Sequence, residues 1–275
     1  MQQEPAHEFP QFNDDVREAW NTNADFWNER MGEGNSFHNS LVRPSQESLL
    51  DLRPGEQLLD IACGNGHFAR QMAEHGVQVT GIDIAPRQIE NAIAASSSYG
   101  DQMRFLVADA TDKQLLSQLG AHFFDAISCG MAIMDMAEVE PLAESVAALL
   151  KPGGRFVFTV MHPAFNSPNH LSRSVERVEM EDGRIVDTYA VKISHYIKPT
   201  AYEGVAIIGQ PVLQRYFHRP ISVLLNVFFN QGFVADGIEE PVFGGTDPRH
   251  ALDWDNFHEI PPVLAVRLRL MDSGQ

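Results

Sequence analysis

The chain has 275 residues, of which 44% are hydrophobic and 21% are charged, a composition typical of a globular protein with a sizeable core. Its formal net charge of -17 argues against partners that present phosphate groups, so we expect binding neither to nucleic acid nor to a membrane surface. No apolar run is long enough to cross a bilayer, and neither end has the pattern of a signal peptide. We therefore expect a cytoplasmic protein.

The first part of the chain is predicted to be helical. Residues 1–14 are polar and contain proline, which indicates a loose terminus. Apolar side chains then recur at helical spacing over residues 15–31, with Trp20 and Trp27 on one face, and a second helix is expected over residues 44–52. An aromatic face of this kind packs in a core more often than against a cofactor.

From residue 57 onward the pattern alternates between short apolar strands and amphipathic helices. This alternation indicates a parallel sheet covered by helices on both faces. The predicted strands are residues 57–62, 77–82, 103–108, 124–128 and 155–161, and the predicted helices are 66–74, 86–95 and 139–150.

After Pro163 the alternation stops. Strand-like runs and the turn Glu181-Asp182-Gly183 indicate an inserted antiparallel lobe with a hairpin. The α/β pattern then resumes with a helix and two strands, separated by a long loop at residues 241–262. The runs of the insert are residues 174–180, 184–194 and 212–218, and the resumed elements are 221–231, 233–240 and 263–270.

These patterns predict three units. Residues 1–54 form an N-terminal helical cap, and residues 55–163 together with 220–275 form the α/β core. Residues 164–219 form an inserted lid on the substrate side.

The two cysteines, Cys63 and Cys129, each lie inside an apolar run. Two cysteines in a chain of this length do not make a disulfide framework, and no Cys or His spacing typical of a metal site is present. We therefore expect two small buried side chains and no metal.

The first predicted strand ends in Asp60-Ile61-Ala62-Cys63-Gly64-Asn65-Gly66, a sharp turn into a helix. Gly64 and Gly66 lack a Cβ, so the backbone can approach a ligand closely, and the amides at the helix start can receive an anion. An ordinary tight turn explains the same residues, and the glycines alone do not decide between the two interpretations.

Two further carboxylates follow later strand ends. Asp83 comes about twenty residues after the glycines, the spacing at which a carboxylate binds both hydroxyls of a ribose. Asp109 and the amide of Ala110 suit the exocyclic amine and ring nitrogen of an adenine, although an aspartate that caps the next helix is an equally simple explanation. Together with the glycine turn, these residues predict a nucleoside-containing ligand.

The strand ends, taken in order, resemble the class I S-adenosylmethionine-dependent methyltransferases. The matching stretches are LLDIACGNG, VTGIDIAP, FLVADATD, FDAISCGMAIMDM and LKPGGRFVFTV, between about residues 57 and 163. The resemblance implies a Rossmann-like, mostly parallel seven-stranded sheet, with S-adenosylmethionine as cofactor and S-adenosylhomocysteine as product. In one departure, Ala62 stands where the usual motif has its first glycine, a variant common among small-molecule methyltransferases.

The resemblance also implies a role for each matching residue. Asp60 would lie near the methionine ammonium, Asp83 would bind the ribose hydroxyls, and Asp109 would flank the adenine. Backbone groups after the fourth strand would lie near the methionine end, and Trp27 would pack against the cofactor or the acceptor. The expected cofactor-binding set is Trp27, Asp60, Ala62, Cys63, Gly64, Gly66, Asp83, Ile84, Asp109, Ala110, Cys129 and Met131.

The implied reaction is in-line methyl transfer to a small organic acceptor, which depends mainly on orientation and exclusion of water. If the acceptor must lose a proton, His162 after the fifth strand is the candidate general base, and a histidine bonded to the backbone is the alternative. His38, His195 and His218 are weaker candidates. The protein is expected to be a monomer or a homodimer.

Two other functions remain open from the residues. Gly64-Asn65-Gly66-His67-Phe68-Ala69 satisfies the dinucleotide pattern G-x-G-x-x-G/A, which indicates an NAD-dependent oxidoreductase. Against it, Asp60 precedes the glycines, and the Asp109-Ala110 and LKPGG stretches have no place in that pattern. A non-catalytic regulator that binds the cofactor is the second alternative.

Overall fold

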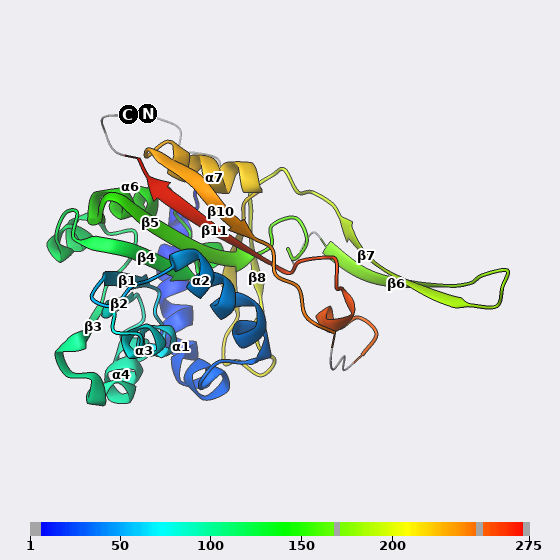
Figure 1. Cartoon of the computed structure of the whole chain (residues 1–275), viewed down its shortest axis with the longest axis horizontal. Helices are drawn as coiled ribbons and strands as arrows, with labels where there is room; N and C mark the ends of the chain where they lie inside the picture. The colour runs from blue at the N-terminus through cyan, green and yellow to red at the C-terminus, as the bar shows by residue number, and fades with distance from the viewer. Residues whose placement is uncertain (1–6, 168–170, 246–249, 272–275) are drawn as a thin grey trace.

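The computed structural model describes residues 7–167, 171–245 and 250–271 (Figure 1). A sheet of seven strands lies at its centre, made of β1 (Gln57–Ile61), β2 (Gln78–Asp83), β3 (Met103–Val107), β4 (Phe124–Gly130), β5 (Leu150–Met161), β10 (Phe233–Glu239) and β11 (Val263–Leu270). The strand order is β10-β11-β5-β4-β1-β2-β3. β1 to β5 pair in parallel, whereas β11 is antiparallel to both β5 and β10. The predicted mostly parallel sheet is confirmed.

Both faces of this sheet are buried, as the continuous apolar strands predict. Successive side chains of a strand point to opposite faces, so Phe156 and Phe158 pack on one side and Val157 on the other. Phe228 stacks on Phe158 with ring centroids 5.8 Å apart. The helices are α2 (Arg43–Leu50) and α3 (His67–Glu74) on the Val157 side, α6 (Glu140–Leu149) and α7 (Ile221–Phe229) on the Phe158 side, and also α4 (Pro86–Ala95) and the short α5 (Lys113–Leu116).

The predicted N-terminal helices are present. α1 (Asn13–Met31) packs against α4, and a π-helical turn at His38–Val42, which the sequence did not predict, leads into α2. α1 is amphipathic and buries Val16 and Ala19 on its inner side.

The segment before α1 is anchored, and the prediction of a loose terminus is wrong for its described part. Glu8 accepts hydrogen bonds from the amides of Val139 and Glu140 at 2.9–3.0 Å, which caps the first turn of α6. Phe9 stacks on Phe217 with ring centroids 5.4 Å apart. These partners lie far along the chain, so no local pattern indicates them. Residues 1–6 lie outside the described chain.

The inserted segment forms two antiparallel pairs. β6 (Leu171–Glu179) and β7 (Ile185–Ile193) make a long hairpin that projects away from the rest of the molecule (Figure 1). β8 (Thr200–Gly204), which was not predicted, pairs with β9 (Gln214–His218), and β9 packs against α1. The second pair therefore packs against the N-terminal helix α1.

The predicted loop between β10 and β11 contains a short 3-10 helix at Trp254–Asn256, and its residues 246–249 lie outside the described chain. The two cysteines are buried free thiols, as expected. None of the helices among the described residues is both long enough and apolar enough to span a membrane.

Candidate functional site

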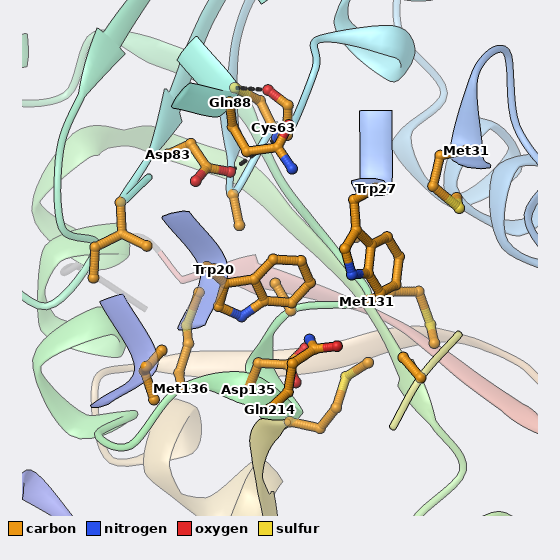
Figure 2. A pocket seen from close by; sticks show the side chains of 18 of the residues that line it. Trp20, Trp27, Met31, Cys63, Asp83, Gln88, Met131, Asp135, Met136 and Gln214 are labelled. Atoms are coloured by element: carbon orange, nitrogen blue, oxygen red, sulfur yellow. Dashed lines mark hydrogen bonds between the residues drawn. The ribbon is translucent and has the colours of Figure 1, made fainter. Parts of the chain in front are cut away.

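A cavity of about 650 Å³ lies at the carboxyl ends of β1, β2 and β4 (Figure 2). α1 and the turn before α2 contribute one wall, and β8 and β9 contribute another. Ligands of open α/β sheets bind at this edge, and the volume is typical of small-molecule sites. The predicted residues that line the cavity are Trp27, Asp60, Ala62, Cys63, Gly64, Asp83, Ile84, Asp109, Ala110 and Met131, while Gly66, Cys129 and His162 are not part of the lining.

The turn after β1 adopts a left-handed backbone, which its glycines allow. φ is 54° at Gly64, 73° at Gly66 and 55° at Ala62. A Cβ on Gly64 would meet nothing within 4 Å, so this backbone lies open to the cavity. A Cβ on Gly66 would lie 2.8 Å from the ring of Phe105. Gly66 therefore faces Phe105 on β3, where a side chain at this position would collide with the ring.

Asp60, at the end of β1, presents an unpaired carboxyl oxygen. Oδ1 accepts a hydrogen bond from Ser128 Oγ at 2.7 Å, whereas Oδ2 is buried and has no hydrogen-bond partner in the described structure. Burial, helped by the nearby Asp83, raises the pKa of Asp60 to about 7, and the hydrogen bond from Ser128 opposes the rise. A group that donates protons or carries positive charge would satisfy this oxygen.

Asp83, at the end of β2, ties that strand to the glycine turn. Oδ2 accepts from the Gly64 amide at 2.9 Å, and Oδ1 accepts from the Ala85 amide at 2.9 Å. Burial raises the pKa of Asp83 to about 6, and the two backbone hydrogen bonds oppose the rise. Each carboxylate oxygen retains a further lone pair for a ligand hydroxyl.

The carboxylate of Asp109 is already engaged within the chain. Oδ1 accepts from the amide and the hydroxyl of Thr111 at 2.9 and 2.7 Å, and Oδ2 pairs with Arg17 at 3.1 Å. The cap of the following helix α5 is Asp112, not Asp109. Asp109 is thus held rigidly at the cavity wall, and its predicted role toward an adenine rests on this position.

The two thiols are not activated as nucleophiles. Cys63 lines the cavity, but burial raises the pKa of both Cys63 and Cys129, so each remains a neutral thiol. Met131 lines the cavity in a left-handed conformation with φ of 52°, next to Gly130, whose Cα approaches the side chain of Gln46.

The geometry of His162 argues against the predicted general base. Its ring is 1% exposed and lies outside the cavity lining. Nε2 bonds to Glu240 Oε1 at 2.9 Å, and Nδ1 accepts from the amides of Ala164 and Phe165 at 3.1 and 3.2 Å. Both ring nitrogens are therefore used to hold the turn after β5, which is the structural alternative.

Of the weaker histidine candidates, His218 is held by hydrogen bonds as His162 is, whereas His38 lies at the cavity. His218 bonds through Nδ1 to Ser167 and through Nε2 to the carbonyl of Tyr196. His38 does line the cavity, where burial lowers its pKa to about 4 and the neighbouring His67 adds to the effect. It is consequently a neutral ring.

Several buried polar residues in the cavity were not predicted from the sequence, and Asp135 and Gln214 are two of them. Asp135 is 5% exposed and Gln214 is 1% exposed, and both line the cavity (Figure 2). Within the described parts of the chain, Asp135 Oδ1 and both polar atoms of the Gln214 side-chain amide lack hydrogen-bond partners. Asp135 stands out in the apolar run MAIMDM, which is a usable signal, but nothing in the sequence around Gln214 indicates this position.

The remaining walls are aromatic and apolar. The rings of Trp20 and Trp27 are 5.2 Å apart, and those of Tyr202 and Tyr216 are stacked at 5.5 Å. No lysine or arginine lines the described cavity. The cavity therefore combines aromatic faces with the carboxyl groups of Asp60, Asp83, Asp109, Asp135 and Glu203, and burial raises the pKa of Asp135 well above its usual range.

Comparison with known proteins agrees with this geometry. Residues 59–158, which run from β1 into β5, match the family described as "Methyltransferase domain". This part of the chain is a class I S-adenosylmethionine-dependent methyltransferase domain. The methyltransferase domain holds the glycine turn together with Asp60, Asp83 and Asp109.

Curated relatives match over the same part of the chain. A ubiquinone biosynthesis O-methyltransferase of Xanthomonas axonopodis pv. citri is 32% identical over 108 residues, which cover 39% of this chain and 44% of the relative. The enzyme of that name from Coxiella burnetii is 26% identical over 147 residues, 52% of this chain and 59% of the relative. The chain thus spans about half the length of the curated relatives it matches.

Solved structures share the fold over more of the chain. An S-adenosylmethionine-dependent methyltransferase from Mesorhizobium loti superposes with a TM-score of 0.60 at 24% identity, covering 82% of this chain and 96% of the other. A 1,6-didemethyltoxoflavin-N1-methyltransferase from Burkholderia thailandensis does so with a TM-score of 0.55 at 16% identity, covering 96% and 91%. At these identities the likeness establishes the fold of the methyltransferase domain and its surroundings.

Proposed function

We propose that this protein transfers a methyl group from S-adenosylmethionine to a small organic acceptor held in the same cavity. The observation that carries the proposal is the unpaired, buried oxygen of Asp60 beside Asp83 and the open glycine turn. These groups favour a ligand with a positive charge and hydroxyl donors. S-adenosylmethionine has both, in its ammonium group and its ribose.

The residues present fit this cofactor. Asp60 Oδ2 would hold the ammonium group, and Asp83 would accept the ribose hydroxyls. The backbone at Gly64 would line the amino-acid portion, with Asp109 and Ala110 beside the adenine. When bound, the cofactor supplies a methyl group on a positively charged sulfur, which is already activated for displacement.

The chain's own contribution is orientation and exclusion of water. The aromatic walls formed by Trp20, Trp27, Tyr202 and Tyr216 cover the carboxyl edge of the sheet and leave a cavity sized for small molecules. The net charge of -17 and the acidic lining oppose an acceptor built on phosphates. A small acceptor follows from the size of the cavity.

The two alternative functions fit less well. A pyrophosphate of NAD at the glycine turn would face the buried carboxyl group of Asp60, which would repel it. A regulator that binds only the cofactor would leave the second group of unpaired polar atoms, at Asp135 and Gln214, without a ligand. Both features favour a methyltransferase that binds two ligands.

Titration calorimetry tests the proposal with S-adenosylmethionine, S-adenosylhomocysteine and NAD. We expect binding of the first two only. Asp83→Ala should weaken S-adenosylhomocysteine binding by about 10–100-fold, the effect of losing hydrogen bonds to a charged group. Asp112→Ala, which removes an exposed carboxylate outside the cavity, is the matched control and should keep wild-type affinity. Tight NAD binding without binding of the other two would contradict the proposal.

A further inference from the structure

We propose that Asp135 and Gln214 bind the methyl acceptor and that this acceptor is a basic amine. The inference rests on the proposed methyltransferase function and adds the chemical class of the acceptor and the residues that contact it. Among the described residues, nothing hydrogen-bonds to Asp135 Oδ1 or to the side-chain amide of Gln214.

The two residues come from distant parts of the chain and meet at one wall of the cavity (Figure 2). Asp135 ends a 3-10 helix, Ile133–Asp135, which follows β4, and Gln214 is the first residue of β9, the strand that packs against this helix. Although both are buried, they make no hydrogen bond to each other. The unpaired atoms are therefore available to a ligand in the cavity.

The buried charge of Arg219 is satisfied within this chain. Arg219 is 4% exposed, and it pairs with Glu8 and donates to the carbonyls of Met136 and Ala137. Asp135 lies close to that network in sequence, but its Oδ1 has no such partner among the described residues. A buried carboxyl group without a partner is costly, and such groups concentrate at functional sites. Asp135 is thus best explained by a ligand that donates hydrogen bonds to it.

The charge of the cavity selects the kind of ligand. Its lining contains carboxyl groups but no lysine or arginine, so a carboxylate or phosphate on the acceptor would be repelled. An ammonium group is attracted to Asp135 and, in addition, to the faces of aromatic rings such as Trp20 and Tyr202. The cavity wall is therefore complementary to a cation that can lose a proton.

The same residues account for the proton that the amine must lose. An ammonium group pairs with the Asp135 carboxylate, and because burial disfavours both charges, the proton passes from nitrogen to oxygen. The nitrogen lone pair then forms the new N–C bond, the C–S bond of the donor breaks, and its electron pair stays on sulfur. The methylated nitrogen leaves as a cation, and Asp135 returns its proton to solvent.

Gln214 orients the nitrogen. Its Oε1 can accept a second N–H of the amine, which fixes the direction of the lone pair, and its Nε2 can donate to a polar atom elsewhere on the acceptor. Gln214 is accordingly a specificity residue, while Asp135 contacts the reacting nitrogen.

Calorimetry on the full chain saturated with S-adenosylhomocysteine tests the proposal. The probes are arylalkylamines, including phenethylamine and tryptamine, with para-ethylphenol and phenylpropionate as neutral and anionic counterparts. At least one amine should bind about tenfold or more tightly than either counterpart. Asp135→Asn should weaken that amine by about tenfold or more, the effect of losing a charged hydrogen bond, while S-adenosylhomocysteine affinity stays unchanged. Glu18→Gln, which removes an exposed carboxylate of α1 outside the cavity lining, should leave amine affinity unchanged.

The outcomes separate the two proposals. Loss of S-adenosylhomocysteine binding in the wild-type protein would overturn the methyltransferase function itself. If that ligand binds but no amine does, or if the phenol or the acid binds best, the amine proposal is overturned alone. Equal amine affinity in the wild-type protein and Asp135→Asn would likewise remove Asp135 from the acceptor site.

Discussion

Glu8 and Arg219 meet in the interior of the protein, with Glu8 Oε2 3.4 Å from Arg219 Nη2 and side-chain exposures of 5% and 2%. Arg219 also donates to the carbonyls of Met136 and Ala137 at 3.0 and 2.7 Å. Because Glu8 caps α6 at the same time, this pair fastens the start of the chain to the segment that follows Asp135.

Replacing Glu8 by alanine should destabilise the protein by about 3–5 kcal/mol, because it leaves a buried guanidinium without its carboxylate. Urea unfolding followed by circular dichroism measures the change. Glu18→Ala removes an exposed carboxylate from α1 and should change stability by no more than about 0.5 kcal/mol. A loss below about 1 kcal/mol for Glu8→Ala would mean that the two carbonyls suffice for Arg219.

Asp60→Asn should stabilise the ligand-free protein at neutral pH. The pKa of Asp60 is raised from 3.8 to about 7, so the folded state binds the proton more tightly than the unfolded state. The stability from this group is fully present below about pH 4 and is lost as the pH rises toward 7, at about 1.4 kcal/mol per pKa unit at most. The asparagine variant lacks this loss and still accepts from Ser128. Melting temperatures from pH 4.5 to 8 should diverge as the pH rises, and parallel curves would contradict the prediction.

Cofactor affinity should depend on pH through the same group. The ammonium group needs the ionised form of Asp60, so S-adenosylhomocysteine affinity should fall as the pH drops below about 7, by at most about tenfold per unit. Asp83, with a pKa raised to about 6, adds to the loss below that value. Calorimetry at several pH values measures this. In Asp60→Asn the affinity should be lower throughout, and the part of the pH dependence above pH 6 should disappear.

Asp135→Leu should raise the stability of the ligand-free protein by about 1–2 kcal/mol, because an unpaired buried carboxyl group is replaced by an apolar side chain next to an open cavity. Chemical unfolding provides the measurement. Asp125→Leu is the contrasting control, since Asp125 accepts from the Gln57 amide and from Lys151, and its loss should destabilise. If Asp135→Leu were destabilising, the carboxyl group would have to be satisfied in the free protein.

The central fold and the cofactor side could be predicted because their signals are local. The apolar run around Phe156 and Phe158 indicates a strand with both faces buried. The residue types of Gly64 and Asp83, and the spacing between them, are enough to indicate a ligand site. The boundaries of the elements were predicted less closely. β5 begins at Leu150 rather than at residue 155, because Leu150 already pairs with Phe124 on β4 before a shift in register.

The acceptor side could not be predicted, because its residues gain their roles from partners far along the chain. β8 pairs with β9 across a long connection and is too short to stand out by composition. Gln214 is buried only because β9 packs beside α1 and the turn after β4. The structural role of His162 depends on Glu240, which no local pattern links to it.

The walls of the cavity come from separate stretches of the chain. The carboxyl groups of Asp60, Asp83, Asp109 and Asp135 fall within the methyltransferase domain at residues 59–158, whereas Trp20, Tyr202, Gln214 and Tyr216 lie outside it. Substitutions in β8 or β9 can therefore change this wall of the cavity without altering the carboxyl groups that we propose hold the donor. The acceptor wall of the cavity can therefore change in sequence while the segment that carries the donor-binding carboxyl groups is kept.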